Sequence, residues 1–364
     1  MPVKSIKLYE SMEATLMTEQ SKLTEIPAHI THVPHGEPFV LSPNSIIVED
    51  SGTEYLIGED AQAEKPDSVR QFGGSLSSPQ YRRLLKGALA KTLGEGKQKL
   101  SVALSAPHHH IDKFRAGPSK FHLSQEASDL FTETVRTIKF KTGRSDSEWK
   151  TLELIPDGDI KVKFEYQAVV QAIPKGVNSF ILWQIGYGDW QQTALVEKRV
   201  MKDACMRLEG LSGAVKLFAK RTGLAFGDAC IAWETEEMPD SAHMDGLNGK
   251  KMSCKATKEQ CLRHWIGAAT GDLFPTVEQW RSRLTNLIVS GGLTKDETFW
   301  RILNEEVLGQ GMKLWKINEL PESFKGRELC EDPSFTCVQG LLKNAELALD
   351  LGNGRLKTGL RLDN

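Results

Sequence analysis

The sequence predicts an α/β protein, and three observations lead to this prediction. Apolar runs that suit strands alternate along the chain with amphipathic stretches that suit helices. With 364 residues and 40% hydrophobic content, the chain can bury one large core or two cores of ordinary domain size, and two are favoured. Three glycine turns each follow an apolar strand, at residues 184–189, 289–292 and 349–354.

The first half of the chain is expected to contain several strands and one well-defined helix. Residues 39–58 predict short strands joined by turns, and residues 79–93 predict a helix with four apolar side chains on one face. The segment LSVALSAP predicts a buried strand that Pro107 stops. The segments EWKTLELI and DIKVKFEYQ predict a further pair of strands.

In the second half, the Pro-Lys-Gly segment at residues 174–176 predicts a domain boundary before the strand SFILWQIG. A helix is predicted over residues 276–287, because Thr276 and Gln279 have the spacing of a capping box and apolar residues recur at helical intervals after them. The segment LIVSGGL predicts a buried strand. Alternating leucines over residues 347–360 predict a pair of strands at the end.

The three glycine turns together suit a nucleoside triphosphate. A single turn carries little weight, because glycine after a strand is commonly a tight turn. A triphosphate held between two domains needs a backbone hairpin from each, whose amides approach phosphate oxygens without a Cβ in the way. It also needs a third turn beneath the base and ribose. The sequence therefore predicts two phosphate hairpins and one base turn.

The residue pattern in these turns resembles the nucleotide motifs of the actin superfamily. The first phosphate motif is matched by Asp350, Gly352, Gly354 and Lys357. The second phosphate motif is matched by Gly186, Tyr187 and Gly188, and the adenosine motif by Ser290, Gly291 and Gly292. The segments YLIGEDA, YRRLLKGALA, VALSAP and DPSFTCVQGLLKNA are similar to the plasmid-segregation actins of the ParM kind. The resemblance covers most of the chain from about residue 23 onward and implies an actin-like (ribonuclease H-like) two-domain ATPase fold.

The order of the motifs departs from that family, in which the first phosphate motif opens the protein. Here it follows the segment that resembles the final helix. A short link can join old termini that lie in one domain, so a circularly permuted order is expected. Domain I then comprises residues 1–175 and 333–364, and domain II comprises residues 176–332. A C-terminal hairpin without a ligand is the alternative, and the sequence does not predict a place for residues 1–22.

The resemblance implies ATP or ADP with Mg²⁺ as cofactors. Asp350 would hold the metal through water, and Lys357 would reach the phosphates. The neighbouring residues Asn353, Arg355 and Asp189 would complete the two phosphate hairpins.

Three further side chains are candidates for the hydrolysis step. Glu165, with Gln167 close behind it, matches the water-orienting residue of the family, and a solvated charge at a strand end is the alternative for Glu165. Gln184 stands where the family has an aspartate that helps to hold the metal shell. A neutral amide adds no charge, so slow hydrolysis is expected unless Asp189 compensates.

The function implied is a filament-forming ATPase that segregates plasmid DNA or other cargo in bacteria. Its partners would be further copies of itself and a DNA-binding adaptor. The alternative is a non-polymerising ATPase or kinase of the same superfamily, although no segment resembles a sugar-kinase substrate motif. A nucleotide-binding structural protein that hydrolyses poorly is a third reading.

Charge and hydropathy argue against nucleic acid or a membrane as a direct partner. Lys and Arg number 46 and Asp and Glu number 48, so no basic face is expected. No run of eighteen apolar residues and no signal peptide are found, so a cytoplasmic protein is expected.

Cysteine and histidine patterns do not favour a metal site. The six cysteines contain no CxxC pair, so reduced structural thiols are expected. Cys254, Cys261 and His264 lack the spacing and the fourth ligand of a common zinc site. The three adjacent histidines at residues 108–110 would point to alternate sides of an extended chain, so a solvated loop is favoured.

Overall fold

The computed structural model of the chain forms two compact units. Unit 1 comprises Met1–Ala172 and Phe335–Asn364, and unit 2 comprises Ile173–Ser334. Both ends of the chain thus belong to the same unit. The structure describes residues 20–64, 78–106, 129, 136–173, 177–239, 253–321, 332–352 and 354–362.

The central sheet of unit 1 has five strands in the spatial order β1-β17-β16-β6-β9. Their bounds are β1 Gln20–Pro27, β6 Val102–Ala106, β9 Lys161–Phe164, β16 Leu347–Leu351 and β17 Arg355–Leu362. Strand β17 pairs antiparallel with β1 and β16, whereas β6 is parallel to β16 and β9. The predicted strand pair at the C-terminus is therefore confirmed, and it fills the middle of the sheet.

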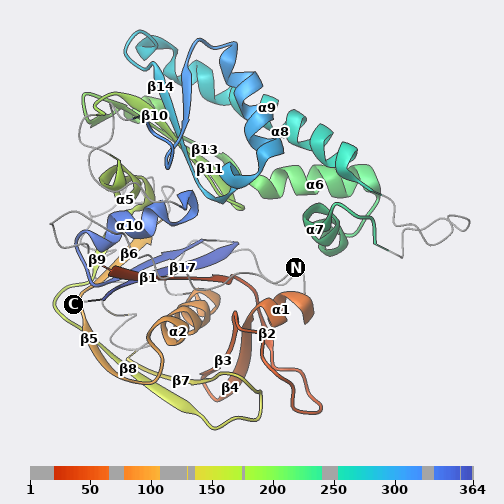
Figure 1. Ribbon diagram of the computed structural model, residues 1–364, viewed down its shortest axis with the longest axis vertical. Coiled ribbons are helices and arrows are strands. Elements are labelled where there is room, and N and C mark those ends of the chain that lie inside the picture. The colour runs from red at the N-terminus through yellow and green to blue at the C-terminus, as the bar shows by residue number, and fades with distance from the viewer. Residues whose placement is uncertain are drawn as a thin grey trace, which may run out of the picture. The chain divides into compact units, whose positions relative to one another are not determined.

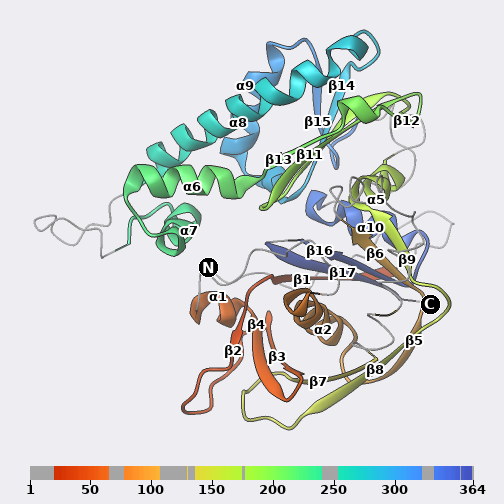
Figure 2. The same ribbon diagram turned by 180° about the vertical axis from the view of Figure 1, so that it is seen from behind.

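Helices cover both faces of this sheet. Figures 1 and 2 show α5 (Glu165–Ala172) and α10 (Thr336–Leu342) on one face and α2 (Pro79–Leu93) on the other. Strand β16 is consequently buried on both sides, and Leu347, Ala348 and Leu349 are fully enclosed. The predicted helix over residues 79–93 is confirmed: Ser78 caps its first turn, and Gly94 with φ 73° ends it.

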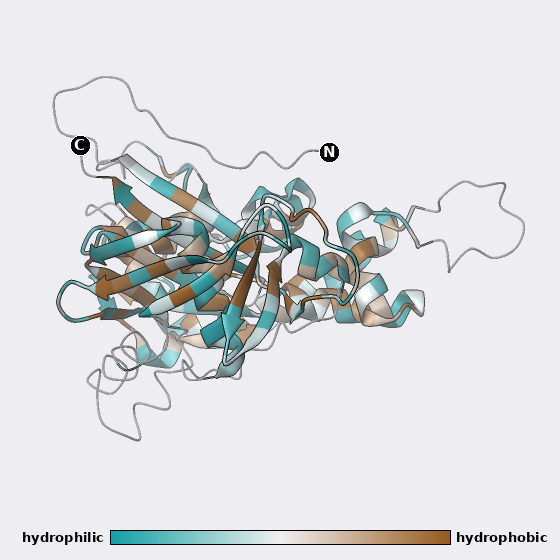
Figure 3. Ribbon diagram, turned by 90° about the horizontal axis from the view of Figure 1, so that it is seen from below, coloured by the Kyte–Doolittle hydropathy of each residue, from teal (hydrophilic) through white to brown (hydrophobic). Residues whose placement is uncertain are grey.

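An outer sheet of unit 1 has six strands in the order β2-β4-β3-β7-β8-β5. The bounds in this part of the chain are β2 Ile30–His32, β3 Ser45–Asp50, β4 Thr53–Gly58, α1 Glu59–Glu64, β5 Gly96–Leu100, β7 Thr137–Lys141 and β8 Lys150–Pro156. In Figure 3 hydrophobic and hydrophilic residues alternate along several strands, as expected of half-buried sheets. The predicted pairing of the segments EWKTLELI and DIKVKFEYQ is wrong, because β8 pairs with β5 and β7, whereas β9 pairs with β6.

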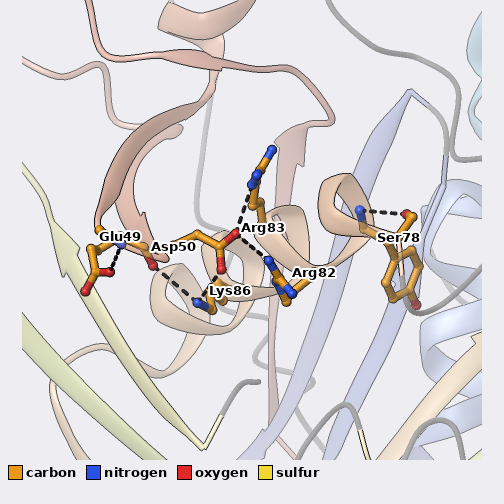
Figure 4. Close-up of polar contacts among 8 residues, drawn as sticks. Glu49, Asp50, Ser78, Arg82, Arg83 and Lys86 are labelled. Carbon is orange, nitrogen blue, oxygen red and sulfur yellow. Dashed lines mark hydrogen bonds and ion pairs between the residues drawn. The ribbon is translucent and has the colours of Figure 1, made fainter. Parts of the chain in front are cut away.

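A buried carboxylate, Asp50, joins the outer sheet to helix α2 (Figure 4). Its side chain is 3% exposed, and it accepts hydrogen bonds from Arg82 Nη2 at 2.8 Å, Arg83 Nε at 3.0 Å and Lys86 Nζ at 2.9 Å. Burial by itself raises the pKa of Asp50, but the hydrogen bonds from the three cations outweigh burial and lower the pKa to about 2. Asp50 is thus the counter-charge of three cations.

Replacement of Asp50 by asparagine is expected to lower the free energy of unfolding by about 3 kcal/mol, because three cations lose their buried counter-charge. Urea unfolding of the full chain measures this change. Glu153→Gln is the matched control, since Glu153 and its partner Lys97 are 51% and 67% exposed and their pair adds little. Equal stability of the Asp50→Asn variant and the wild type would contradict the prediction.

The pKa of Asp50 also gives this contribution a pH dependence. The value of about 2 in the folded chain lies below the ordinary value of 3.8, so the contribution is present at neutral pH. It is lost as the pH falls from about 4 to about 2. The stability difference between wild type and Asp50→Asn is therefore expected to shrink over that interval.

The sheet of unit 2 has six strands in the order β12-β11-β10-β14-β15, with β13 also paired to β11. The strand bounds are β10 Phe180–Ile185, β11 Asp189–Val196, β12 Arg199–Val200, β13 Met206–Glu209, β14 Asn286–Ser290 and β15 Lys313–Lys316. The helix bounds are α6 Leu211–Thr222, α7 Phe226–Thr235, α8 Lys255–Val277 and α9 Glu297–Leu308. Short 3₁₀ turns are Lys202–Ala204, Glu278–Trp280, Gly292–Lys295 and, before α10, Pro333–Phe335.

The predicted helix over residues 276–287 is wrong. Helix α8 ends at Val277, where the predicted helix was to begin, and the chain turns into β14 at Asn286. Thr276 does not cap a helix, because its hydroxyl donates to the Leu273 carbonyl and accepts from Gln192 Nε2 at 2.7 Å. A tertiary contact therefore uses the side chain that the local pattern assigned to a cap.

The sheets of the two units share one pairing pattern. In unit 2, β10 and β11 form an antiparallel hairpin, β12 and β13 pair with β11, and β14 and β15 continue in parallel beyond β10. In unit 1, β16 and β17 form the hairpin, β1 pairs with β17, and β6 and β9 continue beyond β16. In unit 2 the hairpin strands come first in the chain and the other strands follow them. In unit 1 the hairpin strands come last in the chain.

Among the described residues, no helix is long and apolar enough to cross a membrane. The described cysteines are all free thiols, and four of them are buried. The histidines at residues 108–110, residues 1–19, Cys330 and the segment 174–176 lie outside the described part of the chain.

Candidate functional site

The first candidate hairpin joins β16 to β17 in unit 1. Gly352 N donates to the Arg355 carbonyl at 3.1 Å, and the Gly354 carbonyl accepts from Ala28 N at 3.1 Å. Arg355 begins β17 and lies 3.6 Å from Glu25 of β1. Asn353, at the tip, lies outside the described residues.

Asp350 and Lys357 are direct cross-strand partners beside this hairpin. Ser105 Oγ, from the end of β6, donates to Asp350 Oδ1 at 2.7 Å. Among the described residues, the Lys357 ammonium has no hydrogen-bond or ion-pair partner. A carboxylate and an uncompensated ammonium thus stand side by side near the carboxyl ends of β16 and β6, the edge of such a sheet where ligands commonly bind.

Glu165 follows β9 directly and is the first residue of α5. Its position at the carboxyl end of β9, which is parallel to β6, brings it to the same edge of the sheet. The Gln167 side chain folds back on the start of the helix, where its Oε1 accepts from Phe164 N at 3.4 Å. Glu165 therefore lies at a helix start, and Gln167 serves as a local cap.

Two buried side chains that the sequence did not indicate, Tyr81 and Cys337, lie close to these carboxylates. Burial and the carboxylates of Asp350 and Glu165 raise the pKa of the Tyr81 hydroxyl far above its usual range. Burial, followed by the same two carboxylates, also raises the pKa of the Cys337 thiol well above its usual value. Tyr81 lies in YRRLLKGALA and Cys337 in DPSFTCVQGLLKNA, two segments that resemble the ParM-like actins. This resemblance is the sequence feature that could have pointed to the two residues.

The second candidate hairpin joins β10 to β11 in unit 2. Gly186 N donates to the Asp189 carbonyl at 2.9 Å and closes the turn. The carbonyls of Gly186, Tyr187 and Gly188 accept from the first backbone amides of helix α6 and its cap, at 3.1, 2.8 and 3.2 Å. The N-terminus of α6 is thus satisfied by the hairpin, and these three carbonyls face the protein.

Gly210, the residue before α6, has no room for a side chain. A Cβ there would lie 2.5 Å from Asp189 N, 2.5 Å from the Gly186 carbonyl oxygen and 2.8 Å from the Tyr187 carbonyl oxygen. We expect Gly210→Ala to displace the hairpin and to weaken nucleotide binding at least tenfold, as the loss of a hydrogen bond to a charged phosphate would. Calorimetric titration with ATP measures the change.

The control for that substitution is Gly223→Asn, at the end of the same helix. Gly223 has open space around it and φ 72°, a conformation that asparagine tolerates. Unchanged ATP affinity in the Gly210→Ala variant would contradict the assignment of this hairpin to the phosphates.

Gln184 and Asp189 flank the second hairpin and differ in their contacts. Asp189 Oδ2 accepts from Arg207 Nε at 3.0 Å and from Gln191 Nε2 at 2.8 Å, so its charge is already compensated within unit 2. The Gln184 amide oxygen is buried and has no hydrogen-bond partner among the described residues. Gln184 is therefore the flanking side chain that retains an unused acceptor.

The predicted base turn follows β14, which lies parallel to β10 and pairs Ser290 with Gln184. Gly291 has φ 118°, and a Cβ would meet the Ile185 carbonyl oxygen at 2.2 Å, so only glycine fits this position. Gly292 begins a 3₁₀ turn beside Ser334. The base turn and the second hairpin thus lie on adjacent strands of one sheet.

The described residues contain no group of three or more His, Cys, Asp or Glu side chains that could hold a metal ion. Cys254 and Cys261 are buried in the hydrophobic core of unit 2. Burial raises the pKa of both thiols, which disfavours the thiolate that zinc requires.

Comparison with known proteins gives no match to a family model and none to a curated protein. Among solved structures, the archaeal actin homologue Ta0583 is 15% identical, with a TM-score of 0.57, over 89% of this chain and 98% of that one. The actin-like protein Alp7A is 12% identical, with a TM-score of 0.60, over 89% and 92% of the two chains. The chain has an actin-like fold.

A third structure, a ParM filament from Clostridium botulinum, is 10% identical, with a TM-score of 0.58, over 89% of this chain and 95% of that one. In this actin-like chain, the two predicted phosphate motifs lie at equivalent hairpins of the two sheets, β16–β17 and β10–β11. The predicted adenosine motif directly follows β14.

Proposed function

We propose that this actin-like protein binds ATP with Mg²⁺, hydrolyses it and assembles into filaments. The observation that carries the proposal is the pair of equivalent glycine hairpins. One lies beside a carboxylate and an ammonium that no described residue pairs with, and the other lies beside a buried amide oxygen that no described residue bonds to. Hairpins of this kind suit the β- and γ-phosphates, whose charge both backbone amides and a lysine neutralise.

We also propose that the chain order is a circular permutation of the actin-like one. The two sheets pair alike, yet the hairpin opens the strand sequence of unit 2 and closes that of unit 1. Moving residues 347–362 in front of β1 would give both units the same order. Residues 1–175 with 333–364 would then be domain I, and residues 176–332 domain II.

Each candidate residue has a role in this proposal. Lys357, Gly352 and Gly354 would bind phosphate oxygens from unit 1. Gly186, Tyr187 and Gly188 would do so from unit 2, and Ser290, Gly291 and Gly292 would lie beneath the adenosine. The structure of Ta0583 in complex with ADP, 11% identical to this chain, supports a nucleotide as the ligand of this fold.

The residues present fit a hydrated Mg²⁺ ion. Asp350 Oδ2 has no hydrogen-bond partner among the described residues, and Gln184 Oε1 is buried without one. Oxygen acceptors are the groups that Mg²⁺ and its waters prefer. Asp350 would hold the ion through water, Gln184 would accept a hydrogen bond from that shell, and the ion would supply positive charge to the phosphates.

Hydrolysis in this proposal depends on positioning rather than on covalent chemistry. Glu165 would orient the attacking water, because it directly follows β9, the strand next to β6, at the edge that carries Asp350. Gln167 is occupied as a helix cap and would hold the start of α5 in place. Gln184 brings no negative charge, and Asp189 is paired with Arg207, so hydrolysis is expected to be slow.

The same comparison supports self-association as part of the proposal. A ParM filament from Clostridium botulinum and a non-polymerisable ParM mutant are among the similar solved structures, which supports a homopolymer. A heterologous interface that does not close generates an open filament. Segregation of plasmid DNA or other cargo through a DNA-binding adaptor, in the cytoplasm, would be the use of such a filament.

Sedimentation and phosphate release, measured together with ATP and Mg²⁺, with ADP and without nucleotide, test the proposal. A pellet that forms only with ATP, together with phosphate release, is the expected result. Release without a pellet would favour a non-polymerising ATPase or kinase. A pellet without phosphate release would favour a structural nucleotide-binding protein. The absence of both a pellet and phosphate release would overturn the proposal.

A further inference from the structure

Three polar side chains stand in line across adjacent strands of the central sheet of unit 1. Asp350 of β16 is the direct partner of Lys357 on β17. On the other side, β16 and β6 pair through Leu349 and Leu104, so the next residues, Asp350 and Ser105, follow in register. Asp350 thus has a hydroxyl on one flank and an ammonium on the other.

The contacts made by these residues are unequal. Ser105 is 4% exposed, and its Oγ donates to Asp350 Oδ1 at 2.7 Å. The Ser105 side chain also interacts with the buried thiol of Cys337. Lys357 forms no ion pair with Asp350, although directly paired residues on antiparallel strands have Cβ atoms only about 5 Å apart.

The short distance across the strands creates a competition for Asp350. An ion pair between Asp350 and Lys357 would occupy the carboxylate that is assigned to the metal and the ammonium that is assigned to the phosphates. A hydroxyl that donates to Oδ1 from the opposite flank holds the carboxylate away from Lys357 and leaves Oδ2 available. A hydrogen bond to a charged group is strong enough to select one rotamer of the carboxylate.

We propose that Ser105 is a positioning residue that holds Asp350 on the β6 side and so keeps Lys357 free. The role in binding rests on the proposed function, because it concerns the residues assigned to Mg²⁺ and ATP. The effect on Lys357 does not, because the competition exists in the chain without nucleotide.

The first experiment measures Lys357 in the full chain without nucleotide. Brief acylation with an N-hydroxysuccinimide ester, followed by peptide mass spectrometry, gives the labelling rate of this amine. Ser105→Ala is expected to slow the labelling of Lys357 at least threefold, since an amine held in an ion pair with Asp350 is less available to the ester. Ser105→Thr, which keeps the hydroxyl, is expected to retain the wild-type rate. An unchanged rate in Ser105→Ala would overturn the inference, whether or not the protein binds ATP.

The second experiment measures ATP affinity as a function of Mg²⁺ concentration. The Ser105→Ala variant is expected to need roughly tenfold more Mg²⁺ to reach half of the maximal gain in ATP affinity, because it loses one hydrogen bond to a charged group. Wild-type protein that binds no ATP would refute the proposed function alone. A Ser105→Ala variant with the Mg²⁺ dependence of the wild type would refute the positioning role.

The chain offers a matched control in Ser101. Its Oγ donates to Glu346 Oε2 at 2.9 Å across the same two segments, at the opposite end of β6 and β16. Ser101→Ala removes this hydrogen bond, and also the one that Oγ accepts from Glu346 N at 3.0 Å, without touching Asp350. If Ser101→Ala changed Lys357 labelling and Mg²⁺ dependence as much as Ser105→Ala did, the effect would be a general loosening of the sheet, and the inference would fail.

Discussion

Replacement of Lys357 by alanine is expected to weaken the proposed ATP binding by roughly 100-fold, because the variant loses the half-buried charge that we assign to a phosphate. Among the described residues the Lys357 side chain has no hydrogen-bond or ion-pair partner, so its truncation breaks no polar contact and leaves the backbone pairing of β17 in place. The variant should therefore unfold at the same urea concentration as the wild type. Calorimetric titration with ATP and Mg²⁺ measures the affinity.

Lys97→Ala is the matched control for this substitution. Lys97 lies on the edge strand β5 of the same unit, is 67% exposed and reaches Glu153 at 3.7 Å. Its removal subtracts the same charge from unit 1 and is expected to leave ATP affinity unchanged. Equal affinities in the Lys357→Ala and Lys97→Ala variants would remove the first hairpin from the nucleotide site.

Replacement of Gly340 by alanine is expected to abolish the proposed ATP hydrolysis and to destabilise the chain by about 3 kcal/mol, the upper end of what overpacking costs. Gly340 lies in α10, where a Cβ would stand 1.8 Å from the Ala168 carbonyl oxygen of α5. Backbone cannot rotate away as a side chain can, so α5 must move. Glu165 begins α5, and the proposed water-orienting group would move with it.

Gly267→Ala is the control for Gly340→Ala, because it makes the same change inside helix α8 where nothing lies within 4 Å. Alanine there should be neutral or stabilise the helix by about 0.5–1 kcal/mol. Urea unfolding and phosphate release measured on both variants separate the two outcomes. A Gly340→Ala variant with normal stability and turnover would show that α5 and α10 need not pack so closely.

The candidate site was predictable from the sequence only where it depends on local motifs. Asp350 and Lys357 were predicted from a motif that resembles the first phosphate motif of the actin superfamily, and the whole motif lies within one hairpin. Ser105 was not found, since its contact with Asp350 spans 245 residues. Gly210 was missed for the same reason: its need for a bare backbone comes from the hairpin at residues 186–189, which packs on it.

The predicted helix at residues 276–287 illustrates the opposite error. Its capping-box spacing was real as a pattern, but Gln192, far away in the sequence, takes the Thr276 hydroxyl. The local pattern favours a helix at this position, but tertiary packing favours the observed turn and strand. Packing prevails because a capping box stabilises a helix by about 1 kcal/mol, whereas burial of a whole segment stabilises the fold by more.

By itself, the sequence determined the α/β class, the strand pair at the C-terminus and the three glycine turns, because these depend on alternation and turn chemistry between near neighbours. Only the tertiary structure decided that the last two strands lie between the first strand and β6, and that Ser105, Tyr81 and Cys337 gather around Asp350. Strand pairing and burial join residues hundreds of positions apart, and no local pattern records which distant partner a strand or side chain will meet.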